Sequence, residues 1–86
     1  MTYKESIDPL VSKMIEKLLD REGEKISWEY CTISKLLGFL EQEVRELEVA
    51  FEQCNPRDVA REAVDVANYA MMIFDNANRV LESYND

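Results

Sequence analysis

The chain has 86 residues, of which 18 are acidic and 10 are basic, so its formal net charge at pH 7 is −8. This length allows one domain, and 47% hydrophobic residues is too high a share for a disordered chain. Because nucleic acids and anionic membranes repel an acidic chain without a basic cluster, we expect neither as a partner. The acidity does not exclude nucleotides, since a divalent cation can bridge carboxylates and phosphates.

The sequence contains only two glycines and two prolines, which leaves little material for β-hairpins and favours long helices. We therefore expect a single all-α domain over residues 1–86, with frayed ends at about 1–6 and 83–86. No apolar run approaches the roughly 18 residues of a transmembrane helix, and the N-terminus lacks the apolar core of a signal peptide, so we expect a cytoplasmic protein. Histidine is absent, which removes the usual zinc ligand and the usual general base.

Capping signals define the first two predicted helices. Asp8 stands directly before a proline and reads as an N-cap, and Gly23 is placed to end that helix. Ser27 is the candidate N-cap of the second helix, which nothing interrupts before Cys54. If Cys31 and Cys54 both lie on this helix, roughly 34 Å separates them and no disulfide can join them.

Asn55 followed by Pro56 predicts the start of a third helix, which should continue to about Glu82. Long helices joined by short loops pack antiparallel, so we expect an antiparallel bundle of three main helices. From Val64 to Phe74 the third helix is apolar on nearly all sides, and such a helix must be covered on all sides. Because a monomer of this size cannot cover it, we expect a homodimer or homotetramer to complete the bundle.

Two pairs of carboxylates differ from the other acids. On a helical wheel Glu43 and Glu46 lie on a flank with apolar or small neighbours, and Glu62 and Asp65 share a face with apolar residues. The solvated face of the second helix carries another set, namely Glu41, Arg45, Glu48 and Glu52. Since partly buried carboxylates are costly without a partner, four acids with few bases nearby predict a cation. Oxygen-only ligands favour Mg²⁺, with Mn²⁺ as a possible substitute.

The two acid pairs together resemble the signature of the MazG-like nucleoside triphosphate pyrophosphohydrolases. All-α dUTPases and phosphoribosyl-ATP pyrophosphohydrolases look like relatives of the same group. The segments 36–47 and 60–69, which surround the acids, are similar as well, and the resemblance extends from Trp28 to Phe74.

The resemblance implies a Mg²⁺-dependent enzyme that cleaves a nucleoside triphosphate to the monophosphate and pyrophosphate. The implied metal ligands are Glu43, Glu46, Glu62 and Asp65. Glu43 or Glu46 is also expected to orient or deprotonate the attacking water. The expected substrate contacts are Trp28, Lys35, Arg61, Asn68 and Tyr69. Trp28, Asn68 and Tyr69 each have a second interpretation as residues of the core or of a buried interface.

Two other classes of function stay open. One is a non-catalytic helical adaptor or regulator that keeps the fold and the cation and acts through protein partners. The other is a plain helical bundle without a ligand, since each acid pair alone is common on solvated helix faces. These alternatives differ in whether the four carboxylates converge and whether nucleotides are hydrolysed.

Overall fold

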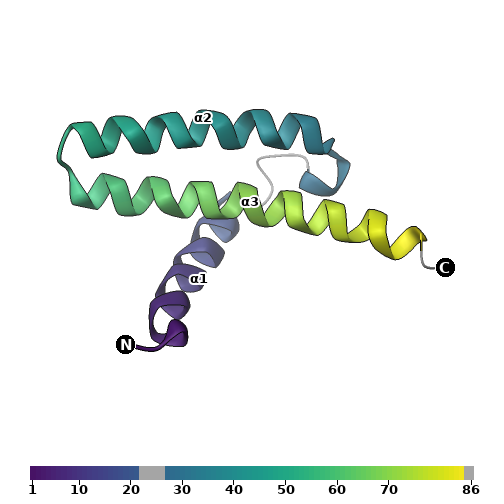
Figure 1. The fold of residues 1–86 in the computed structure, drawn as a ribbon, viewed down its shortest axis with the longest axis horizontal. Coiled ribbons are helices and arrows are strands. Elements are labelled where there is room, and N and C mark those ends of the chain that lie inside the picture. Colours follow the sequence, from purple (N-terminus) through teal and green to yellow (C-terminus); the bar gives the residue numbers. More distant parts are fainter. Residues whose placement is uncertain (22–26, 85–86) are drawn as a thin grey trace.

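The computed structural model describes residues 1–21 and 27–84, and this part of the chain is helical throughout, without a β-strand. It consists of α1 (Tyr3–Asp20), a short 3-10 helix η1 (Trp28–Tyr30), α2 (Ile33–Glu52) and α3 (Pro56–Tyr84). The expected all-α class is therefore confirmed (Figure 1). None of the described helices is long and apolar enough to cross a membrane.

Helices α2 and α3 form an antiparallel pair joined by a tight turn (Figure 1). Cys54 adopts a left-handed φ of 55° in this turn, a conformation that commonly ends a helix. Asn55 then caps α3, because its Oδ1 accepts a hydrogen bond of 3.2 Å from the backbone N–H of Asp58. The predicted end of the second helix and the predicted start of the third are confirmed, and α3 continues to Tyr84.

Helix α1 begins earlier than predicted. Thr2 is its N-cap and accepts a hydrogen bond from the backbone N–H of Glu5, while Pro9 lies inside the helix. The prediction that Asp8 starts this helix was wrong. Residues 3–10 are exposed, so water can replace the backbone hydrogen bond that Pro9 cannot donate. The predicted stop at Gly23 lies outside the described residues.

The predicted N-cap of the second helix was also wrong. Ser27 accepts a hydrogen bond from the N–H of Glu29 and caps η1, whereas Thr32 caps α2 through the N–H of Lys35. Cys31 consequently lies before α2 and not on it. The expectation of unpaired cysteines is nevertheless confirmed, since both cysteines are free thiols.

Helix α1 does not lie alongside the other two helices. Figure 1 shows it leaving the middle of α3 at a steep angle, so that only its C-terminal half meets the α2/α3 pair. Met14, Lys17 and Leu18 are its half-buried residues, and every other residue of α1 is exposed. The structure is therefore an antiparallel pair, α2 and α3, with α1 crossing α3 at a steep angle. The three helices do not all lie side by side.

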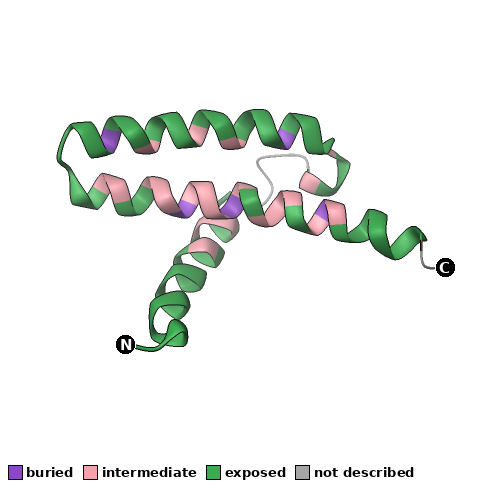
Figure 2. Cartoon of the chain, in the orientation of Figure 1, coloured by how far each residue is buried: buried purple, intermediate pink, exposed green. Residues whose placement is uncertain are grey.

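The core of the described chain is small. Leu36 and Ala50 of α2 and Val64 of α3 are its only buried apolar residues. Figure 2 shows how few segments of these two helices are buried. Phe51 and Phe74 are 63% and 68% exposed, respectively. Phe51 belongs to α2, whereas the apolar middle of α3 is mostly half-buried, with Ala70 and Phe74 exposed.

A polar network attaches η1 to α3. The buried Asn76 donates from Nδ2 to the backbone carbonyls of Trp28 and Cys31, each at 3.0 Å. The indole N–H of Trp28 donates to Asp75 at 2.8 Å, and Arg79 forms ion pairs with Asp75 and with Glu29. Because these bonds join segments far apart in the sequence, they fix the position of Trp28 beside α3.

We expect Asn76→Ala to lower the free energy of unfolding by about 1–3 kcal/mol, because it removes two hydrogen bonds, although the Trp28 carbonyl keeps the N–H of Cys31. Asn78→Ala is the matched control, since Asn78 is exposed on the same helix and its replacement should stay within about 0.5 kcal/mol. Urea unfolding followed by circular dichroism measures both values. Equal stability of the two variants would contradict a structural role for the Asn76 side chain.

Candidate metal centre and adjoining cavity

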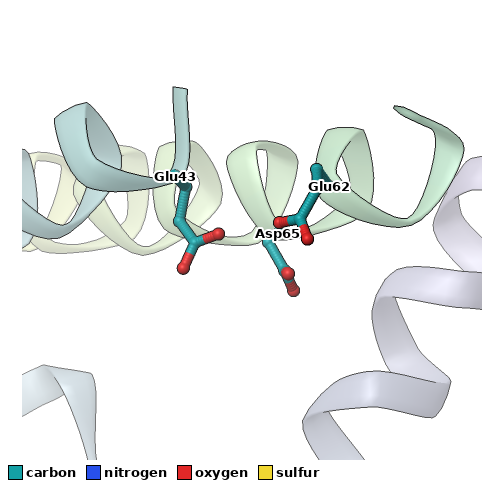
Figure 3. Close-up of side chains that lie close together, drawn as sticks. All are labelled: Glu43, Glu62 and Asp65. Carbon is teal, nitrogen blue, oxygen red and sulfur yellow. The ribbon is translucent and has the colours of Figure 1, made fainter. Parts of the chain in front are cut away.

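Three carboxylates converge where α2 faces the N-terminal half of α3. Glu62 and Asp65 are three residues apart, which puts them on one face of α3, and the antiparallel packing of α2 brings Glu43 opposite them. One oxygen atom from each of the three lies within 4.8 Å of the other two. Figure 3 shows their carboxyl groups on the same side of the helix pair. We call this set the acidic triad.

The acidic triad contains oxygen atoms that lack partners. Oε2 of Glu43 and Oε2 of Glu62 are buried and accept no hydrogen bond within the described chain. A buried carboxylate oxygen without a donor is costly, so the site favours a ligand that supplies positive charge. Three half-buried oxygen donors, with neither sulfur nor imidazole among them, match the coordination chemistry of Mg²⁺ or Mn²⁺.

Burial and neighbouring negative charges raise the pKa values of two carboxyl groups of the triad. The pKa of Glu43 is raised from 4.5 to about 7, mainly by burial, then by its interaction with Glu46 and by the negative charges of Asp65 and Glu62. The pKa of Glu62 is also raised, first by burial and then by the charges of Asp65 and Glu46. Without a cation, Glu43 and Glu62 therefore hold protons more firmly than free carboxyl groups do.

Lys17 is a member of this site that the sequence analysis missed. Its Nζ lies 2.5 Å from Oδ1 of Asp65 and donates to the backbone carbonyl of Arg61 at 3.5 Å. The positive charge of Lys17 partly counteracts the rise in the pKa of Glu62. No local sequence pattern indicates this contact, because it depends on the angle at which α1 crosses α3.

Glu46 takes a different position from the other three predicted ligands. It is exposed and does not belong to the acidic triad, although its charge raises the pKa of both Glu43 and Glu62. Glu46 and Glu62 together line a hollow of about 380 Å³. The structure thus brings three of the four predicted ligands into one site and leaves Glu46 beside it.

A larger cavity of about 620 Å³ lies between α1, η1, α2 and α3 and adjoins the triad through Asp65. Three of the predicted substrate contacts line this cavity, namely Trp28, Asn68 and Tyr69. The ring of Tyr69 lies 5.6 Å from the ring of Phe39, centroid to centroid. Burial raises the pKa of the Tyr69 hydroxyl, and the charge of Glu43 adds to that rise.

Asn68 is the most buried polar residue of the cavity wall, with 5% of its surface exposed. Its Nδ2 donates to the backbone carbonyl of Met14 at 3.3 Å, which ties α1 to α3. Its Oδ1 is buried and accepts no hydrogen bond within the described chain. A buried amide oxygen without a donor costs free energy, because it has lost the hydrogen bonds that it would make with water.

The two basic residues expected to contact substrate lie elsewhere. Lys35 is exposed and its Nζ lies 6.0 Å from the centre of the Phe39 ring. The Arg61 side chain is 59% exposed and pairs with Asp58 at 2.5 Å. Among the described residues, the basic ones that line the cavity are Lys17 and Arg21, both at the C-terminal end of α1.

Comparisons with known protein families, with curated proteins and with solved structures found no match.

The raised pKa values predict how the metal-free protein responds to pH. A carboxyl group whose pKa is higher in the folded state stabilises the fold below its unfolded value, and this contribution is lost as the pH rises through the folded value. For Glu43 this window extends from pH 4.5 to about 7. We therefore expect the free energy of unfolding, measured with a chelator present, to fall between pH 5 and pH 8.

Glu43→Gln provides the control, because it removes the group with the raised pKa. Its free energy of unfolding should fall less steeply over the same interval than that of the unsubstituted protein. Parallel pH profiles of the two proteins would show that Glu43 does not titrate in this window.

Proposed function

We propose that the protein is a Mg²⁺-dependent nucleoside triphosphate pyrophosphohydrolase, with Mn²⁺ able to replace Mg²⁺. The observation that carries the proposal is the junction of the acidic triad with the 620 Å³ cavity at Asp65. Unpaired carboxylate oxygens on one side suit a divalent cation, and an aromatic cavity on the other side suits a nucleobase. The resemblance of the two acid pairs to MazG-like enzymes favours the same activity.

The acidic triad supplies the oxygen atoms that would hold the cation. When bound, a divalent cation neutralises phosphate charge and lowers the pKa of a water molecule. The reaction breaks the anhydride bond between the α- and β-phosphates, and water supplies the new oxygen and loses a proton. We assign the orientation of that water, or the acceptance of its proton, to a carboxylate oxygen of Glu43 or Glu46. Glu46 suits this role because it stands beside the triad and not within it.

The cavity would hold the nucleoside part of the substrate. Its volume lies within the roughly 300–1,000 Å³ typical of small-molecule sites. Trp28 and Tyr69 offer ring faces on which a base can stack, and Oδ1 of Asn68 can accept a hydrogen bond from a base or sugar. Because Asn76 and Asp75 fix Trp28 beside α3, this wall is arranged before a ligand enters.

Glu62→Gln tests the metal site, because it keeps the shape of the side chain and removes its charge. With a chelator present, the variant should be as stable as the parent protein or more so, since one like charge is gone. With Mg²⁺, the parent should gain melting temperature and the variant should not. Release of pyrophosphate from a panel of nucleoside triphosphates should fall about 100-fold in the variant.

Glu48→Gln is the matched control, because Glu48 is exposed on α2 and lies outside the triad. It should change stability by less than about 0.5 kcal/mol and keep both the response to Mg²⁺ and hydrolysis. If Glu62→Gln and Glu48→Gln respond alike to Mg²⁺, the proposed metal site is wrong.

The exposed apolar residues favour one further candidate, a helical adaptor or regulator that acts through protein partners. Val49, Phe51 and Phe74 are each at least half exposed, and such residues suit protein contacts. An adaptor would show the stabilisation by Mg²⁺ but would release no pyrophosphate from any nucleotide tested. The assay described above therefore separates the two functions.

We also propose that the protein is a homodimer or homotetramer, because one chain covers the apolar part of α3 only partly. Light scattering at micromolar concentration should give two or four times the 10.1 kDa mass of one chain. A mass of one chain under these conditions would refute the proposal.

A further inference from the structure

Lys17 forms an unusual ion pair for this chain. Its pair with Asp65 is the least exposed of those among the described residues, with the two side chains 27% and 13% exposed. By comparison, the side chains of the Lys13–Glu16 pair on the same helix are 67% and 63% exposed. The Lys17 pair is also the one ion pair of the described chain that joins α1 to α3. Exposed ion pairs contribute little to the stability of a protein, and the Lys17–Asp65 pair differs from the exposed pairs of this chain in being largely buried.

The Lys17 ammonium group occupies the edge of the acidic triad, where a divalent cation would bind. It contacts one carboxylate of the three, and Oε2 of Glu43 and of Glu62 remain without a partner. One positive charge is therefore too little for the triad, and a divalent cation that reached all three carboxylates would compete with Lys17 for Asp65.

Arg21 lies one helical turn beyond Lys17 and lines the same cavity. Its positive charge counteracts the rise in the pKa of the Tyr69 hydroxyl, which indicates that the guanidinium group is close to that ring. Lys17 and Arg21 thus give the cavity a cationic edge next to the triad. This edge suits a polyphosphate chain, which carries several negative charges.

We propose that Lys17 is an exchangeable counter-ion. It neutralises Asp65 while no divalent cation is bound, and it moves to the polyphosphate chain, beside Arg21, once a cation occupies the triad. This proposal rests on the proposed function, which supplies both the cation and the polyphosphate. Because Lys17 belongs to α1 and the triad to α2 and α3, the exchange also couples the position of α1 to the occupancy of the site.

Binding measurements on Lys17→Met test the exchange without the need for turnover. In the absence of phosphate compounds, the variant should bind Mn²⁺ about fivefold more tightly than the parent, because the competing ammonium group is gone. With saturating Mn²⁺, it should bind inorganic tripolyphosphate about tenfold more weakly, because one phosphate contact is lost. Electron paramagnetic resonance of free Mn²⁺ measures the first affinity, and isothermal titration calorimetry measures the second.

Lys13→Met is the matched control, since Lys13 pairs with Glu16 on the exposed side of α1 and should leave both affinities unchanged. Arg21→Gln should weaken tripolyphosphate binding and leave Mn²⁺ binding unchanged, because Arg21 does not contact the triad carboxylates. Lys17→Arg keeps the charge and should restore tripolyphosphate binding. These two variants keep the proposal testable if Lys17→Met does not fold.

The outcomes separate this proposal from the proposed function. Opposite shifts of the two affinities in Lys17→Met support the exchange, whereas a purely structural Lys17 would weaken both affinities together. If the parent binds Mn²⁺ and tripolyphosphate but Lys17→Met behaves like Lys13→Met, the exchange is wrong and the metal site stands. If the parent binds neither, both proposals are overturned.

Discussion

Repulsion among Glu43, Glu62 and Asp65 is the constraint that the rest of the structure has to accommodate. Three oxygen atoms within 4.8 Å cannot all carry charge at low cost, so the packing of α2 against α3 must hold them together against that repulsion. Leu36 and Ala50 belong to α2 and Val64 to α3, the same two helices that supply the triad. The small core and the acidic triad thus depend on the same pair of helices.

The sequence predicts α2, α3 and the acid pair on α3 well because these features depend on local signals. Asn55 and the proline that follows it mark the turn, and the spacing of Glu62 and Asp65 alone places them on one face of a helix. The convergence of Glu43 with that pair follows from the antiparallel packing of two long helices joined by a short turn. Glu46 lies outside the triad, although it stands three residues from Glu43 as Asp65 does from Glu62, so the spacing alone does not separate the two pairs.

The helix starts that were mispredicted have a common cause. Thr2 and Thr32 are the actual N-caps of α1 and α2. The prediction chose Asp8 and Ser27 instead, because both are also residues that commonly cap helices. Thr2 followed three residues later by Glu5 is a capping-box pattern that could have identified the true start of α1. No comparable signal exists for Lys17, since its contact with Asp65 arises from how α1 crosses α3 and not from any spacing within α1.

Asn68 shows how the cavity and the triad depend on one another. Nδ2 of Asn68 donates a hydrogen bond to the backbone carbonyl of Met14. This bond helps to fix the point at which α1 crosses α3, and Asn68 lies three residues after Asp65 on α3. The same crossing puts Lys17 against Asp65 and leaves Oδ1 of Asn68 in the cavity wall without a donor. A buried amide that satisfies only its donor side is costly, so the contact of Asn68 with Met14 is made at the expense of its acceptor side. Lys17 and Asn68 therefore both join α1 to α3 and line the cavity, so the position of α1 and the shape of the cavity depend on the same two side chains.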